Sequence, residues 1–388
     1  MKVFGSLGRY AVQIPTHLAV RGAGPSTFLD TYFTYTGVDA NGAPIGRKNI
    51  SNQFSPDGEE GQKKDANVLS ALGMKPNQQD EITLGFEKAY SKSLNYGAKV
   101  TYRKLLATID DYCDDTPFNA YADKNGINRD NYAFVCVNHN PGLSNTFNVD
   151  YSGTGKNYTQ VTLSAKDMGF DTVPAERTYT AVDLFLEHPL TNGWYGKLNY
   201  TWSRSVGSTE GQTKSDIGQT DVAATQSWDM GDLMTNSFGR LPNDRTHQLK
   251  AYGFYELNRE WSIGGNLLLA SGRPTNCIGS HPNPDSPAQG YGSSTFFCNG
   301  VAAPRGTAGD LPWDKRLDVN FAYRPESVKG LGFKVDIFNL FNEQTVQVID
   351  ETYNTGGFGS PVINTYGRVI SYTAPRQVKL SAEYKYKF

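Results

Sequence analysis

Apolar and polar residues alternate with a period of two over many segments of the 388-residue chain. In the segment 194–203, Trp194 and Leu198 fall on one face, whereas Lys197 and Asn199 fall on the other. Successive side chains of a β-strand point to opposite faces of its sheet. The pattern therefore predicts strands that have one apolar face and one polar face.

Eleven such strands are predicted, as five hairpins followed by a final strand. They cover 3–14, 18–37, 81–90, 94–109, 178–188, 194–203, 247–257, 261–270, 317–324, 332–339 and 375–388. The connections within hairpins are short, whereas those between hairpins are long and polar. The long connections cover 38–80, 110–177, 204–246, 271–316 and 340–374. This strict alternation is typical of transmembrane β-barrels, which have short periplasmic turns and long external loops.

Aromatic residues cluster at the short-turn ends of the predicted strands. They are Trp194, Trp261, Phe333, Tyr386 and Phe388. Aromatic girdles of this kind lie at membrane interfaces. A water-soluble barrel or sandwich with these aromatics in its core is the alternative. Loop asymmetry and girdle position together favour an all-β, antiparallel transmembrane barrel.

Composition agrees with half-polar strands. The mean hydropathy is −0.51 although aromatic residues make up 12% of the chain. No run approaches the eighteen or so apolar residues that a membrane-spanning helix needs. The net charge of −2 gives no reason to expect a nucleic-acid partner, because binding to nucleic acid would require a basic stripe. The residues after Met1 also lack the apolar core of a signal peptide.

The four cysteines fall in two local pairs, Cys113 with Cys136 and Cys277 with Cys298. Neither pair has the CxxC spacing of a zinc or redox site. Two loop disulfides formed in an oxidising compartment are the simplest interpretation.

No catalytic or metal-binding motif is present in the sequence. The five histidines are scattered, and GxSxG and HExxH motifs are absent. The segment DKNGINRD (123–130) has calcium-loop residue types, but its glycine comes too early for an EF-hand, so a plain turn is expected. The sequence predicts no enzyme, no cofactor and no metal site.

Two groups of residues are candidates for binding and passage. The polar faces of the strands would line a water-filled lumen. The candidate lumen-facing residues are Lys99, Arg103, Lys197, Asn199, Lys250, Asn320, Arg324, Lys334, Asp336, Lys379 and Glu383. Aromatic residues in the long loops are candidates for capture of an external ligand, namely Tyr112, Tyr132, Trp228, Tyr291, Trp313, Tyr353 and Tyr366. The alternatives are that the polar residues only solvate the lumen, and that the aromatics pack the loops.

Several stretches resemble the C-terminal barrel of TonB-dependent outer-membrane receptors. They are FGRLPNDRTHQLKAYGFYEL (238–257), LLLASGRP (267–274), KVDIFNLFNEQ (334–344) and the closing PRQVKLSAEYKYKF. LPNDRTH and SGRP, with GSLGRY near the start and NPG at 140–142, are more similar to the Oar-like branch. The resemblance implies an outer-membrane location and no enzymatic activity.

Members of that family are similar in having a signal peptide, a TonB-contacting segment, a plug domain and a barrel of twenty-two strands. None of the first three is recognisable here. We therefore expect residues 1–388 to form a single partial barrel domain, the C-terminal half of the barrel. An odd count of eleven would make the first and last strands run in the same direction, so a chain alone would close only through a parallel seam.

The resemblance also implies partners. They are outer-membrane lipid, the barrel-assembly machinery, for which Phe388 belongs to the recognised signal, and an unknown external ligand. The TonB complex is expected only for a full-length protein. The leading hypothesis, implied by the resemblance, is a transport receptor that captures a ligand at its external loops and takes it up or exports it through a plugged barrel in an energy-dependent step. The alternatives are a passive pore or structural barrel, and a soluble secreted β-protein that binds glycans.

Overall fold

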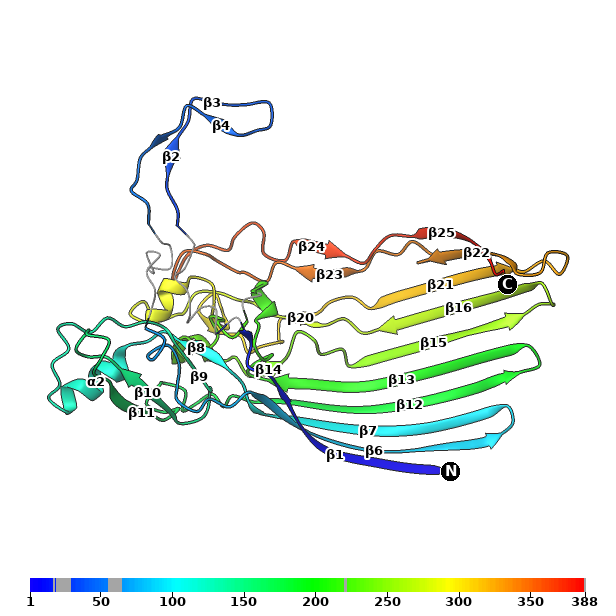
Figure 1. The fold of residues 1–388 in the computed structure, drawn as a ribbon, viewed down its shortest axis with the longest axis horizontal. Coiled ribbons are helices and arrows are strands. Elements are labelled where there is room, and N and C mark those ends of the chain that lie inside the picture. Colours follow the sequence, from blue (N-terminus) through cyan, green and yellow to red (C-terminus); the bar gives the residue numbers. More distant parts are fainter. Residues whose placement is uncertain (17, 19–28, 55–64, 220–221, 387–388) are drawn as a thin grey trace.

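A computed structural model describes residues 1–16, 18, 29–54, 65–219 and 222–386. Its main feature is one antiparallel sheet of long strands, shown in Figure 1. In sheet order the long strands are β1 (Lys2–Val12), β6 (Asn77–Ser91), β7 (Leu94–Ala107), β12 (Arg177–Thr191), β13 (Trp194–Gly207), β15 (His247–Glu256), β16 (Trp261–Ala270), β21 (Asp314–Tyr323), β22 (Leu331–Phe338) and β25 (Gln377–Tyr384). A two-residue strand, β14 (Gly239–Arg240), pairs with the end of β13.

The sheet is a simple meander whose connections differ at its two ends. Each strand pairs with its neighbour in chain order, and the sheet is open, with β1 and β25 at its edges. The turns that join β6 to β7 and β12 to β13 are two residues long. Every short turn lies at one end of the sheet, and the long loops lie at the other (Figure 1). From β6 onward, the predicted alternation of short and long connections is confirmed.

The turn between β12 and β13 shows how sequence sets a hairpin. Asn192 and Gly193 have positive φ values of 52° and 77°. Two successive residues with positive φ match the twist of antiparallel strands, and Asn-Gly is the pair that adopts this conformation at least cost. The sequence NG at this point therefore fixes the register of the two longest central strands.

The predicted hairpin between 3–14 and 18–37 is wrong. β1 pairs directly with β6, from Lys2 opposite Glu87 to Val12 opposite Asn77. The described part of 18–37 contributes no strand to the sheet; residues 29–37 belong instead to a separate ribbon. A surface ribbon with alternating aromatics has the same period-two pattern as a membrane strand, which is why the sequence misled.

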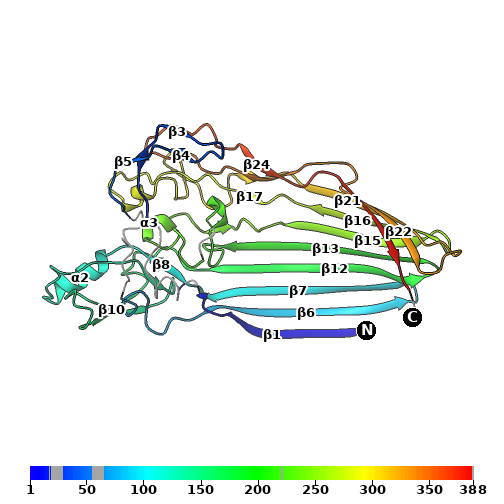
Figure 2. The same cartoon turned by 45° about the horizontal axis from the view of Figure 1, so that its top comes forward.

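This correction removes the difficulty of an odd strand number. The meander contains ten long strands among the described residues, so β1 and β25 run in opposite directions. β1 begins and β25 ends at the short-turn end of the sheet in Figures 1 and 2. The first strand therefore runs toward the long loops, which is opposite to the direction expected from eleven strands.

The ribbon spans residues 29–54 and projects from the long-loop end (Figure 1). Its strands are β2 (Phe33–Thr34), which pairs with β5 (Lys48–Asn49), and β3 (Gly37–Val38), which pairs with β4 (Pro44–Ile45). The Arg47 guanidinium lies 5.0 Å from the centre of the Phe33 ring.

The long loops fold into a body that we call the cap: the described residues of 108–176, 208–246, 271–313 and 339–376. Loop 108–176 contains β8 (Asp110–Tyr112), α2 (Thr116–Lys124), β9 (Val137–His139), β10 (Asn145–Val149) and β11 (Thr159–Leu163). The other cap elements are η1 (Ser215–Ile217), α3 (Gly231–Met234), β17 (Pro274–Thr275), η2 (Pro287–Tyr291), β18 (Phe297–Cys298), β19 (Val301–Ala302), β20 (Gly309–Asp310), β23 (Val346–Ile349) and β24 (Val369–Tyr372). The largest cluster of buried apolar side chains lies in this cap, with Ala71 added from the segment before β6.

None of the described helices is both long and apolar enough to cross a membrane.

Candidate functional site

The polar face of the sheet is a ladder of paired charges. Lys99 Nζ lies 3.3 Å from a carboxylate oxygen of Asp183, which also accepts a 2.6 Å hydrogen bond from Thr201. On the next level Lys197 Nζ lies 3.3 Å from Glu187. These pairs border a cavity of about 820 Å³ that opens on the same face. A face with this charge density is suited to water and polar ligands, not to lipid.

Register places all the predicted lumen residues on this polar face. Lys99 shares it with Asp183, Asn199 lies opposite Lys250, and Asp336 lies opposite both Asn320 and Lys379. The same alternation includes Arg103, Lys197, Lys334 and Glu383, and Arg324 directly follows β21 in phase with Asn320. The structure thus brings these residues to one surface, and their role there remains a proposal.

Aromatic side chains on the polar face lie over glycines of the neighbouring strand. The ring of Phe185 covers Gly97, and the ring of Phe4 covers Gly85, so closely that a Cβ at either glycine would collide with the ring. An aromatic ring over a cross-strand glycine covers backbone that would otherwise be bare and helps to fix register. Lys197 Nζ lies 4.9 Å from the centre of the Phe185 ring, which joins this packing to the charge ladder.

The opposite face of the sheet is apolar and exposed. Its exposed side chains include Leu7, Ile82, Leu84, Val100, Leu184, Leu186, Phe321, Val378 and Leu380. On β13, Trp194 and Trp202 lie eight residues apart on this face, about 26 Å along the strand. The outward apolar band of an outer-membrane barrel is about 25 Å tall between its aromatic girdles. Leu198 lies midway between the two tryptophans.

The girdle aromatics at the short-turn end also stack on neighbours. The Trp194 ring stacks on His188 with 3.5 Å between ring centres, and the Trp261 ring stacks on Tyr323 at 4.5 Å. Phe333 pairs with Tyr323 in register and is exposed. Tyr386 is exposed, while Phe388 lies outside the described residues.

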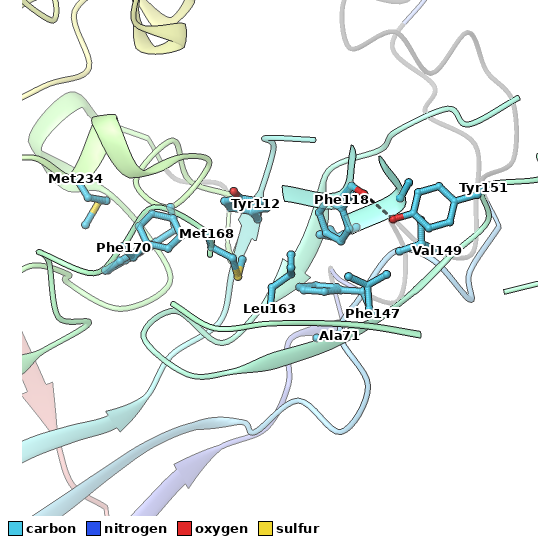
Figure 3. Packing of buried hydrophobic residues seen from close by; sticks show 14 of the residues in the cluster. Ala71, Tyr112, Phe118, Phe147, Val149, Tyr151, Leu163, Met168, Phe170 and Met234 are labelled. Carbon is cyan, nitrogen blue, oxygen red and sulfur yellow. Dashed lines mark hydrogen bonds between the residues drawn. The ribbon is translucent and has the colours of Figure 1, made fainter. Parts of the chain in front are cut away.

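Two of the predicted ligand-capture aromatics are instead core residues of the cap. Tyr112 and Trp228 are both 0% exposed. Figure 3 shows Tyr112 within the cluster of buried residues that also contains Phe147, Phe170 and Met234. Capture of a ligand by Tyr112 or Trp228 is therefore contradicted, because loop packing leaves neither ring any accessible surface.

The remaining five loop aromatics keep some accessible surface. Tyr132 and Tyr291 are half-buried and pack against apolar clusters. Tyr353 and Tyr366 meet edge to face, with 5.3 Å between ring centres. Trp313 is 46% exposed and stacks on His247. These residues are the surviving candidates for contact with an external ligand.

The loop motifs act as anchors between cap and sheet. The buried carboxylate of Asp244, in LPNDRTH, accepts hydrogen bonds from the Ser205 amide at 2.8 Å, Arg240 Nε at 2.8 Å and Arg204 Nη1 at 3.3 Å. Arg273, in SGRP, forms an ion pair of 2.6 Å with buried Glu351. The sequence showed the motifs but not these roles, because all of these partners except Arg240 lie far from the motif residue along the chain.

The cysteines are joined as expected from their spacing, with disulfides between Cys113 and Cys136 and between Cys277 and Cys298. A carboxylate of Asp111 lies near the first pair, but sulfurs in a disulfide are not metal ligands. In 123–130, Arg129 forms an ion pair of 3.0 Å with Asp123.

Burial controls the protonation of the cap core. Burial lowers the pKa of His139 to about 3, because desolvation disfavours the imidazolium. Its ring stacks on Phe170 with 6.0 Å between centres. Burial, with the neighbouring Asp111 carboxylate, raises the pKa of Asp110 well above its usual range. Asp110 accepts two hydrogen bonds of 2.7 Å from Thr225, which tie loop 108–176 to loop 208–246.

His139 makes cap stability depend on pH. Unfolded histidine takes up a proton below its ordinary pKa of about 6.5, whereas folded His139 stays neutral until about pH 3. Its stabilising contribution is therefore complete above pH 6.5 and is lost as the pH falls toward 3. We expect the cap of the wild-type chain to lose about 2 kcal/mol more than His139→Phe between pH 7 and pH 5.

The measurement is hydrogen exchange of the amides of β9 and β10 at both pH values. Phenylalanine keeps the ring stacking, and the raised pKa of Asp110, whose effect on stability has the opposite sign, is present in both chains. An equal loss in wild type and variant would contradict the assignment.

No protein-family model matches the chain. The TonB-dependent transporter Oar of Myxococcus xanthus is 26% identical over 449 aligned residues, which cover 99% of this chain and 37% of the relative. The chain thus spans little more than a third of the length of that curated relative.

Solved outer-membrane structures are similar to it at lower identity. The outer membrane transporter YddB from Escherichia coli is 12% identical, with a TM-score of 0.46 over 81% of this chain and 33% of that chain. The siderophore receptor PiuA from Acinetobacter baumannii is 12% identical, with a TM-score of 0.43 over 86% and 32%. The conclusion therefore comes from the sequence relative: the chain is a homologue of TonB-dependent transporter Oar, and its location is the outer membrane.

Proposed function

We propose that the chain forms part of the barrel of a TonB-dependent transporter, with its polar face toward the lumen and its cap outside the cell. The observation that carries this proposal is the two-faced sheet: the charge ladder of Lys99, Asp183, Glu187 and Lys197 lies behind an apolar wall bounded by aromatics. Apolar outside and polar inside is the arrangement that a water-filled or plugged barrel requires.

The open sheet supports the further proposal that more strands complete the barrel, as in the C-terminal half of a twenty-two-stranded one. Both edges, β1 and β25, present unpaired backbone groups. Each such group costs several kcal/mol in lipid. The similarity to only 37% of a longer transporter agrees with a single partial barrel domain.

The proposed energy source is inferred from the name of the relative. A TonB-dependent transporter works with the TonB complex, and we propose the same for a full-length form of this protein, through a segment other than these residues. We also propose that the barrel-assembly machinery recognises the last strand, β25. Tyr132, Tyr291, Trp313, Tyr353 and Tyr366 are the proposed contacts for the ligand, which stays open among siderophore, peptide, glycan and secreted protein.

The proposal is tested by comparing wild-type cells with a strain that lacks the gene. Mass spectrometry of the medium would identify solutes or proteins that accumulate or disappear in the deletion strain. Transport predicts the same change when wild-type cells receive a protonophore that collapses the proton gradient. A change in the deletion strain that the protonophore does not reproduce would instead indicate a passive pore, and no change at all would contradict both.

A further inference from the structure

Loops 208–246, 271–313 and 339–376 meet at a buried polar network centred on Asn276. The Asn276 side-chain amide donates hydrogen bonds of 2.7 Å to both Asp216 and Glu351. Its carbonyl oxygen accepts one of 2.7 Å from the Gly306 amide, and its own backbone amide donates to Glu351 at 2.9 Å. One buried side chain thus connects all three loops, with both amide protons and the carbonyl oxygen in use.

Charged groups surround this asparagine. Arg305 Nη2 lies 3.0 Å from a carboxylate oxygen of Asp216, and both side chains are almost completely buried. The Arg305 guanidinium also lies 4.7 Å from the centre of the Phe296 ring. Buried Lys214 donates a 3.2 Å hydrogen bond to the Ser294 carbonyl oxygen, which is a second charged contact between loops 208–246 and 271–313.

The network divides the cap into two halves. The first half, loops 108–176 and 208–246, shares one large apolar cluster, in which Trp228 and Met234 pack against residues of β9 to β11. The second half, loops 271–313 and 339–376, is tied internally by the bonds of Glu351 to Arg273 and Asn276. The boundary between the halves contains the polar network, further polar contacts such as the Arg240–Asp310 ion pair and the Ser294–Gln226 hydrogen bond, and one small apolar cluster around Leu233 and Ala288.

Apolar contacts and buried ionic contacts differ in the free energy that is needed to separate them. Separating apolar surfaces exposes them to water without compensation. Separating buried charges restores the hydration that they lost, so the net cost of opening an ion-paired contact is smaller than its close distances suggest. Separating the two halves of the cap at the boundary that contains Asp216 and Arg305 therefore costs less free energy than separating the loops within the first half.

We propose that Asp216, Asn276 and Arg305 form a latch, and that the two halves of the cap separate there as rigid bodies to admit an external ligand. The proposal rests on the transport function proposed above. The Cys277–Cys298 disulfide closes part of loop 271–313 on itself directly beside Asn276, and Glu351 ties loop 339–376 to it, so this half keeps its shape when the latch opens.

The test is hydrogen exchange of the full chain, purified in detergent, with Asp216→Asn. This substitution keeps the shape of the side chain but leaves buried Arg305 without its countercharge. We expect exchange to rise at least about tenfold in 212–219 and 294–306, on the two sides of the boundary. Exchange in β9 to β11 of the first half should stay unchanged.

The matched control is Asp285→Asn, because Asp285 is an exposed aspartate in loop 271–313. An equal rise in the control, or a rise that spreads equally to β9 to β11, would overturn the latch. If Asp216→Asn also raises hydrogen exchange in β12 and β13, the milder variant Arg305→Lys is measured instead. The latch then predicts the same pattern, a rise in 212–219 and 294–306 with no change in β9 to β11. No ligand is used, so this experiment can fail while the transport function stands, and the reverse also holds.

Discussion

We expect Leu198→Arg to lower the stability of the membrane-inserted chain by about 2–4 kcal/mol, because an arginine at the bilayer midplane costs that much on the lipid face of a barrel. Leu198 lies on the apolar face, opposite Leu186 and Ala251 in the adjacent strands. Trp194 and Trp202 mark the two interfaces at equal distances from it. The measurement is urea unfolding, in lipid vesicles, of the full-length protein, in which further strands complete the barrel.

The matched control is the next residue in the same strand. Asn199 lies on the polar face, opposite Lys250, so Asn199→Arg adds a charge to a surface that already carries several. We expect it to change the free energy of unfolding by less than about 1 kcal/mol. Equal losses for the two variants would mean that the faces are not divided between lipid and lumen.

The second large effect is expected for Trp228→Ala in the cap. Trp228 is fully buried and meets the ring of Phe170 edge to face, with 5.1 Å between ring centres. Truncating a buried tryptophan typically costs about 3–5 kcal/mol. The loss should appear as faster hydrogen exchange and easier proteolysis of loops 108–176 and 208–246, while β12 and β13 stay protected.

Trp313→Ala is the control for this prediction. Its side chain is 46% exposed at the start of β21, so we expect little change in cap stability. If Trp313→Ala destabilised the cap as much as Trp228→Ala, the distinction between packing and accessible aromatics would be wrong. Normal exchange in Trp228→Ala would likewise contradict the core position of Trp228.

Much of the sheet could be predicted from the sequence because its strands are amphipathic and local. All ten long strands follow from alternation and turns such as Asn192–Gly193. The register then places Lys99, Asn199, Asp336 and their companions on one face, because a period of two leaves no other arrangement. β1 was predicted as a strand, but its pairing with β6 in the sheet was not. Alternation identifies strands without identifying their neighbours, and residues 29–37 show that a surface ribbon can have the same pattern.

The cap could not be predicted in the same way. Trp228 packs with residues of another loop, and Asp216 meets Asn276 and Arg305 across long stretches of chain. Such contacts depend on how irregular loops cross in space, and no periodicity records this. Local sequence did indicate the disulfide partners, since each pair lies within one loop.

We expect the sheet to span the outer membrane with its short turns on the periplasmic side and its cap outside the cell. Lys92, in the turn between β6 and β7, and Lys156, in loop 108–176, are both exposed. Each is replaced by cysteine in cells and treated with a membrane-impermeant maleimide. We predict that Lys156→Cys is labelled in intact cells and that Lys92→Cys is labelled only after the outer membrane is permeabilised. Labelling of Lys92→Cys in intact cells would contradict this orientation of the sheet.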